Sequence, residues 1–144
     1  MGIREIKFRA LIAHSSRIPI PEGYSVGQWI VGGEIHLYHT TVGPHIHFGP
    51  LRFPVDPNSI SQFTGIRDKN GKEIYEGDAL RLGDHFYLVV WRDCGFMGKQ
   101  LGASSFIGLT HNKDHMEVVS DIWDNDFLSK VGGSRRPSLE DYSF

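Results

Sequence analysis

Four histidines fall within the segment HLYHTTVGPHIH, at positions 36, 39, 45 and 47. His45 and His47 are two residues apart, so in an extended strand their side chains point to the same face. Neutral imidazoles on one face can converge on zinc or iron, with His36 as a third ligand. No cysteine lies nearby and no carboxylate follows at a recognised ligand spacing. The segment therefore has two interpretations, a metal site at His36, His45 and His47 or partly exposed strand histidines.

The stretch TGIRDKNGKEIYEGDAL, residues 64–80, offers a second set of oxygen atoms, at Asp68, Asn70 and nearby acids. A calcium EF-loop needs glycine at its sixth position and a bidentate glutamate at its twelfth. Counted from Asp68, Gly71 stands fourth and Ala79 twelfth, so the spacing argues against a calcium loop. Because Asp68 can hydrogen-bond its own backbone while Asn70 and Gly71 tolerate positive φ, we predict a β-turn instead.

Basic residues gather at two places that could contact a nucleic acid. They alternate outward on the first predicted strand and crowd the central turn, and they are Arg4, Lys7, Arg9, Arg67, Lys69 and Lys72. Acidic residues interleave with both groups, and a net charge of -2 with a sequence pI near 6.4 provides no overall basic field. Nucleic-acid binding is therefore an alternative that depends on a local basic strip.

No other motif in the sequence indicates an enzyme active site. Cys94 follows Arg92 closely, yet no histidine base accompanies it, so we expect an idle thiol. The acidic run around Asp124 is typical of a helix start, with Asp124 as its cap. The chain contains neither a phosphate loop nor a nucleophile elbow. We therefore predict a protein that is not an enzyme and needs no cofactor.

Composition indicates one mainly β domain. The chain has 144 residues, of which 40% are hydrophobic and 12% aromatic, enough to bury a single core. Its one cysteine fits a reducing compartment, and its charged N-terminal segment differs from a secretion signal. No run approaches the length of a membrane span. We expect a cytoplasmic protein with no membrane partner.

Short runs rich in β-branched and aromatic residues set the predicted elements. We expect a half-buried first strand over residues 3–11, a hairpin or bulge at Gly32-Gly33, and two strands that turn at Gly83-Asp84. Prolines make any strand within residues 42–60 short or confined to a sheet edge. Residues 95–110 are predicted to be a glycine-rich loop around one short strand.

Three further features complete this pattern. The strand over residues 85–92 is dense in aromatic and β-branched residues, so we expect Trp91 to lie in the core. A last strand over residues 116–122 precedes the short helix that Asp124 would cap. Residues 132–144 have little to bury and are predicted to be a flexible tail.

The segment SQFTGIRDKNGKEIYEGDAL resembles the signature of the YopX family of phage and prophage proteins. The opening REIKFRA, the lead-in VDPNSISQFTG and the closing EVVSDIWDNDFL are similar to family segments in the same order. Two positions depart from the family pattern: Ala79 replaces a β-branched residue, and Ser120-Asp121 replaces Gly-Asn. The matching motif residues are Phe63, Thr64, Gly65, Asp68, Asn70, Gly71, Ile74, Tyr75, Gly77 and Asp78.

The resemblance implies a mainly β (α+β) domain over residues 1–131, with a β subregion at 1–63 and an SH3-like barrel at 64–131. It implies no established activity, and turn residues of this type serve the backbone first. We therefore expect a phage- or prophage-encoded, non-catalytic binding or assembly module in the bacterial cytoplasm. Its predicted partners are a second copy of itself, a phage or host protein, or nucleic acid. A metal-dependent enzyme centred on His36, His45 and His47 is the competing prediction.

Overall fold

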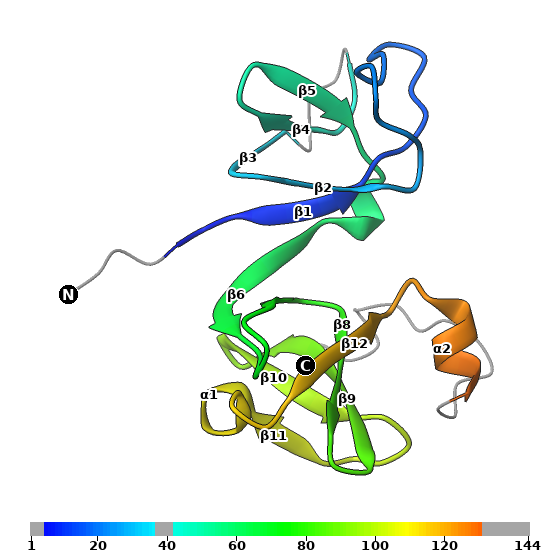
Figure 1. The fold of residues 1–144 in the computed structure, drawn as a ribbon. Helices are drawn as coiled ribbons and strands as arrows, with labels where there is room; N and C mark the ends of the chain where they lie inside the picture. The colour runs from blue at the N-terminus through cyan, green and yellow to red at the C-terminus, as the bar shows by residue number, and fades with distance from the viewer. Residues whose placement is uncertain (1–4, 37–41, 131–144) are drawn as a thin grey trace. The chain divides into compact units, whose positions relative to one another are not determined.

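The computed structural model describes residues 5–36 and 42–130 of the chain. Antiparallel strands dominate and the helices are short, so the mainly β prediction is confirmed. Within the described residues no sheet closes into a barrel. The chain divides into two compact units, which Figure 1 draws, with the boundary between Phe63 and Thr64. Arg4 and the tail predicted at 132–144 lie outside the described residues.

Unit 1 consists of short antiparallel strands (Figure 1). These strands enclose one apolar cluster. Its elements are β1 (Phe8–Leu11), β2 (Trp29–Gly32), β3 (Glu34–His36), β4 (His45–Phe48), β5 (Leu51–Pro54), the 3-10 turn η1 (Pro57–Ser59) and the start of β6 (Ser61–Arg67). The buried cluster comprises Ala10, Ile12, Ile30, Ile46, Phe53 and Val55. β1 pairs with β2 and with the start of β6, while β3, β4 and β5 form a separate sheet in that order.

The structure corrects two expectations for unit 1. The first strand begins only at Phe8, and Ile6 before it is 60% exposed. Gly32-Gly33 does not form a hairpin, because β2 pairs with β1 whereas β3 pairs with β4. A Cβ atom at Gly32 would collide with the carbonyl oxygen of His47, so glycine lets the chain pass closely from one sheet to the other. The proline-rich segment does form short strands, and β5 lies at a sheet edge.

Unit 2 is built on a five-stranded antiparallel sheet in the order β11-β10-β9-β8-β12. Its elements are the end of β6, β7 (Glu73–Tyr75), β8 (Asp78–Leu82), β9 (His85–Arg92), β10 (Gly95–Gln100), β11 (Phe106–Gly108), α1 (Leu109–Asn112), β12 (Glu117–Asp121) and α2 (Asn125–Lys130). β8 and β9 turn at Gly83-Asp84 as predicted. A backbone N–H of Phe127 donates to Asp124 at 3.1 Å, as expected for the helix cap.

Two expectations for unit 2 are wrong. Residues 95–100 form the strand β10 and not a loop. The sequence pattern hid this strand because Gly98 interrupts its apolar residues. A Cβ atom at Gly98 would lie 3.0 Å from Ile107 and 3.2 Å from Tyr87. Glycine there admits the neighbouring side chains and hides the strand signal. Trp91 is 42% exposed and packs edge-on against Phe96, whereas residues 87–90 before it are all buried.

The motif residues around Asp68 form the turn between β6 and β7 and tie it to β12. One carboxylate oxygen of Asp68 accepts from the backbone N–H groups of Asn70 at 2.8 Å and Lys72 at 2.9 Å. The other accepts from the N–H of Val118 at 2.8 Å. Burial raises the pKa of the Asp68 carboxyl, but these donors outweigh that effect and hold the pKa below its ordinary value. In this turn Gly71 has a φ of 81°, the left-handed conformation that favours glycine.

Further motif residues fix the backbone on either side of this turn. Thr64 donates its hydroxyl to the carbonyl of Ile74 at 2.8 Å, and Asp78 accepts from the backbone N–H of Tyr75 at 2.8 Å. Gly77 has a φ of 88°, and a Cβ there would lie 2.8 Å from the ring of Trp123. These contacts hold neighbouring strands and turns of unit 2 together.

Candidate metal centre

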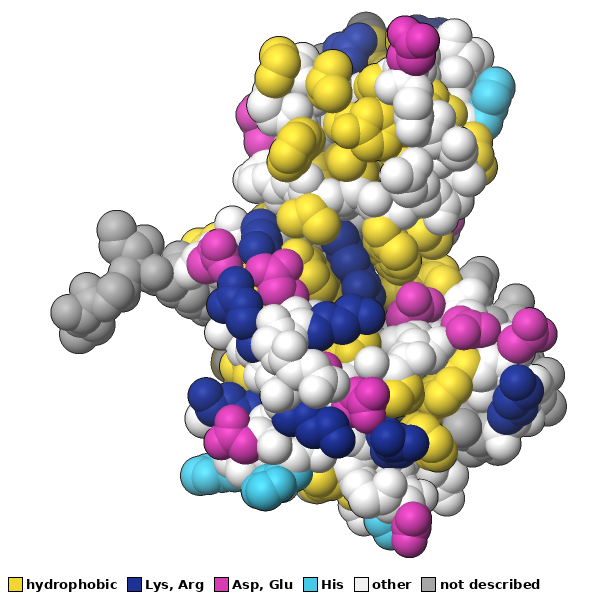
Figure 2. All heavy atoms as spheres, in the orientation of Figure 1, with side chains coloured by type: hydrophobic (Ala, Val, Ile, Leu, Met, Phe, Trp, Pro, Cys, Tyr) yellow, Lys and Arg dark blue, Asp and Glu magenta, His cyan; other side chains and the backbone are white. Residues whose placement is uncertain are grey.

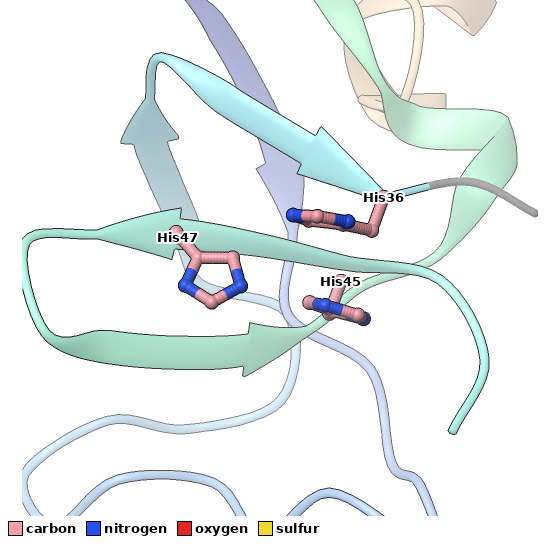
Figure 3. Close-up of side chains that lie close together, drawn as sticks. All are labelled: His36, His45 and His47. Atoms are coloured by element: carbon pink, nitrogen blue, oxygen red, sulfur yellow. The ribbon is translucent and has the colours of Figure 1, made fainter. Parts of the chain in front are cut away.

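The pairing of β3 with β4 gathers the three predicted histidine ligands. The register places His36 opposite His45, Ile35 opposite Ile46, and Glu34 opposite His47. Because side chains alternate along a strand, Ile35 and Ile46 face the apolar cluster and the histidines lie on the other face. Figure 3 shows the three imidazoles side by side there, His36 from β3 and the other two from β4.

The three rings are close enough to share one ion. His36 and His45 are stacked with centroids 4.7 Å apart and planes 9° apart. The ring of His47 lies edge-on to both, 5.0 Å from His36 and 5.2 Å from His45. One ligand nitrogen from each residue lies within 4.8 Å of the other two. In a zinc site each ligating nitrogen lies about 2.0–2.1 Å from the ion, so metal binding requires the three rings to rotate toward one centre.

Hydrogen bonds already orient two of the three rings. Nδ1 of His45 lies 2.9 Å from the carbonyl oxygen of Gly43, and a carbonyl can only accept, so Nδ1 carries the proton. Nε2 of His36 lies 2.8 Å from a carboxylate oxygen of Glu34, which likewise accepts. In the neutral tautomer that carries this proton, the other ring nitrogen holds the lone pair that binds a metal. Histidines that ligate metals almost always donate their other N–H to a carboxylate or a carbonyl in this way.

The electrostatics favour the protonation states that a metal needs. Burial lowers the pKa of the His45 imidazole, and the neighbouring His36 and His47 lower it further against the Gly43 hydrogen bond. The hydrogen bond from His36 lowers the pKa of the Glu34 carboxyl, and the adjacent His47 adds to the effect. A neutral His45 and an ionised Glu34 are the forms that bind and support a cation.

Sequence reasoning missed Glu34. The sequence prediction considered only a carboxylate that follows the histidines, whereas Glu34 precedes His36 by two residues in the same strand. The signal was present as two triplets of the same period, Glu-Ile-His and His-Ile-His, each with isoleucine on the core face. His39 lies outside the described residues.

In unit 1 the residues proposed for nucleic-acid contact already have partners. Lys7 lies 3.5 Å from a carboxylate oxygen of Glu5, and its ammonium lies 4.9 Å from the centroid of the Phe63 ring. The guanidinium of Arg9 stacks 4.2 Å from the centroid of the Trp29 ring. Partial burial of these cations against aromatic rings explains their positions at the start of β1 without a ligand.

In unit 2 the basic residues near the central turn are paired with acids. Arg67 lies 3.1 Å from Glu73, and Lys69 lies 3.8 Å from Glu117, which also pairs with Arg81 at 2.9 Å. On the face drawn in Figure 2, Asp and Glu side chains lie among the Lys and Arg side chains. Lys72 is exposed at the turn. The structure therefore brings together the histidines and leaves the basic residues interspersed with acids.

A comparison with known families accounts for most of the chain. The family model described as YopX protein matches residues 19–128. The chain belongs to the YopX family. The match includes both the histidine cluster and the motif from Phe63 to Asp78, and it confirms the resemblance seen in the sequence. No significant match to a curated protein was found.

The two departures from the YopX pattern face each other in the structure. Ala79 of β8 is paired with Ser120 of β12, next to a register shift between Val118 and Ser120. Ser120 donates its hydroxyl to the carboxylate of Asp124 at 2.7 Å, and Asp121 accepts from the backbone N–H of Trp123 at 2.8 Å. These two hydrogen bonds stabilise the turn that follows β12.

Among the described residues, no helix is both long and apolar enough to cross a bilayer.

Proposed function

We propose that this YopX-family protein binds a divalent transition-metal ion, Zn²⁺ in the first place, through His36, His45 and His47. The observation that carries the proposal is the convergence of one nitrogen from each histidine within 4.8 Å on one sheet face. Two of these rings already donate to outer acceptors, Glu34 and the Gly43 carbonyl. Imidazole suits Zn²⁺, and three histidines are an established ligand set for it.

Metal binding by purified protein tests this proposal. We expect one equivalent of Zn²⁺ by elemental analysis and calorimetry, together with a higher melting temperature when Zn²⁺ is added, because the ion binds only the folded site. His36→Ala and His47→Ala should each abolish both effects. Both positions are only partly buried, so these variants should still fold.

A matched control is His14→Ala, which removes an exposed histidine from the same unit outside the cluster. It should bind Zn²⁺ as the wild type does. Absence of stoichiometric metal in the wild type would overturn the proposal. Equal binding by His47→Ala and the wild type would also overturn it, because the ion would then sit elsewhere.

For unit 2 we propose the SH3-like barrel that the family resemblance implies. The sheet order supports it, since four consecutive strands, β8 to β11, pair in sequence and β12 returns to pair with β8. The short helix α1 lies between β11 and β12 in the chain. We also propose that unit 2 serves binding or assembly through surfaces that its motif residues hold in place. Size-exclusion chromatography with light scattering tests self-association, which a strict monomer at high concentration would contradict.

A further inference from the structure

The carboxylate of Glu34 lies beside the histidine cluster but is not part of the converging ligand set. Among the described residues, the ligand atoms that lie within 4.8 Å of one another come from His36, His45 and His47 alone. Glu34 instead binds Nε2 of His36 at 2.8 Å. A carboxylate that accepts from the outer N–H of an imidazole fixes the ring and its tautomer. Glu34 is therefore placed to orient a ligand and not to replace one.

The three histidines that converge among the described residues leave one position of a tetrahedral ion for a further ligand. The side chains of His36 and Glu34 are 37% and 66% exposed, so solvent reaches this side of the cluster. Three neutral imidazoles by themselves bring no negative charge to balance the double charge of the ion. An exogenous anion would supply that charge.

A cation stands on the same face. Arg52 of β5 is paired with His47, so its side chain projects on the histidine face of the sheet. His47 is thus flanked by Glu34 on β3 and Arg52 on β5. A guanidinium beside a metal ion is suited to a small anion that both can contact.

We infer that the metal in this site keeps an open fourth position that takes a small exogenous anion of the carboxylate type, with Arg52 as a second contact for it. The inference rests on the metal binding proposed above. In this inference Glu34 orients His36 through their hydrogen bond and does not itself coordinate the ion. The site then has an open coordination position, unlike a structural metal site whose ligands all come from the protein.

The test uses the full chain loaded with Co²⁺, whose visible bands report the number and type of its ligands. Titration with azide, and separately with acetate, should change these bands and reach saturation. Arg52→Ala should bind Co²⁺ with the same anion-free bands but bind each anion about three- to tenfold more weakly. Arg17→Ala, an exposed arginine of the same unit, is the matched control and should titrate like the wild type.

Glu34→Gln distinguishes a positioning role from a ligand role. We expect it to leave the anion-free bands unchanged and to weaken Co²⁺ binding about 10- to 100-fold, because only the outer partner of His36 is altered. Changed bands in Glu34→Gln would make Glu34 a ligand and overturn the inference. Bound Co²⁺ whose bands ignore both anions would also overturn it. Failure to bind Co²⁺ at all would instead refute the metal site itself.

Discussion

Replacing Asp68 by alanine should destabilise unit 2 strongly, because one carboxylate there holds three backbone N–H groups. Two of these belong to the turn between β6 and β7, and the third is the N–H of Val118 on β12. A hydrogen bond to a charged group contributes about 1.5–3 kcal/mol. Asn70 and Lys72 are exposed and can regain water, whereas Val118 is half-buried. We therefore expect Asp68→Ala to lower the free energy of unfolding by about 3–5 kcal/mol.

Asp68→Asn refines this prediction. The amide keeps one carbonyl oxygen, which can still accept from Asn70 and Lys72, but it presents an NH₂ group to the N–H of Val118. The loss should be intermediate, about half that of alanine. Urea unfolding followed by circular dichroism measures both values, and amide exchange at Val118 locates the lost bond. A loss below about 1 kcal/mol in Asp68→Ala, with the Val118 amide still protected, would refute the reasoning.

The pH dependence of the same variants follows from the lowered pKa of Asp68. The carboxyl has an ordinary value of 3.8, and its folded-state pKa lies below that. A depressed carboxyl pKa contributes stability that is complete above the unfolded value and is lost as the pH falls through the folded value. The stability gap between wild type and Asp68→Ala should therefore be constant from pH 7 to about pH 5 and should narrow below 3.8. A gap that widens in acid would contradict the assignment.

Two further substitutions test the backbone of the turns in unit 2. Gly71→Val should cost about 1 kcal/mol or more in urea unfolding because Gly71 has a φ of 81°, and an unchanged melting temperature would mean that the turn is misplaced. Cys94→Gly should raise the unfolding free energy by up to about 1 kcal/mol, since Cys94 has a φ of 68° in the turn between β9 and β10. A destabilised Cys94→Gly would show that its side chain makes a contact worth more than the strain.

The histidine pattern predicted part of the candidate site, and the strand register supplied the rest. Alternation alone places His45 and His47 on one face, because the period of a strand is two residues. Which residue of another strand lies opposite depends on the pairing register, which a single sequence does not specify. The opposition of His36 to His45, and of Glu34 to His47, therefore needed the structure.

Strands were predictable from the sequence where β-branched and aromatic side chains form a regular pattern, and they were missed where glycine interrupts that pattern. β8 and β9 follow from dense β-branched and aromatic runs around a Gly-Asp turn. β10 escaped prediction because Gly98 has no side chain to contribute to the apolar pattern, although that absence lets Ile107 and Tyr87 pack closely. Trp91 was misassigned because hydrophobicity identifies a strand without saying where along it burial ends.

The pairing of Ala79 with Ser120 suggests how substitutions are tolerated within the YopX family. The resemblance to the YopX signature implies a β-branched residue in place of Ala79 and glycine in place of Ser120, so we expect one large and one absent side chain to share the space at this pair between β8 and β12 in other members. Here the fully buried Ala79 is smaller and Ser120 is larger, and the serine hydroxyl also reaches Asp124 at the start of α2. Reverting either position alone would overfill or empty that space, whereas reverting both restores its volume. We therefore expect the residues at these two paired positions to covary among family members, which an alignment of YopX sequences would test.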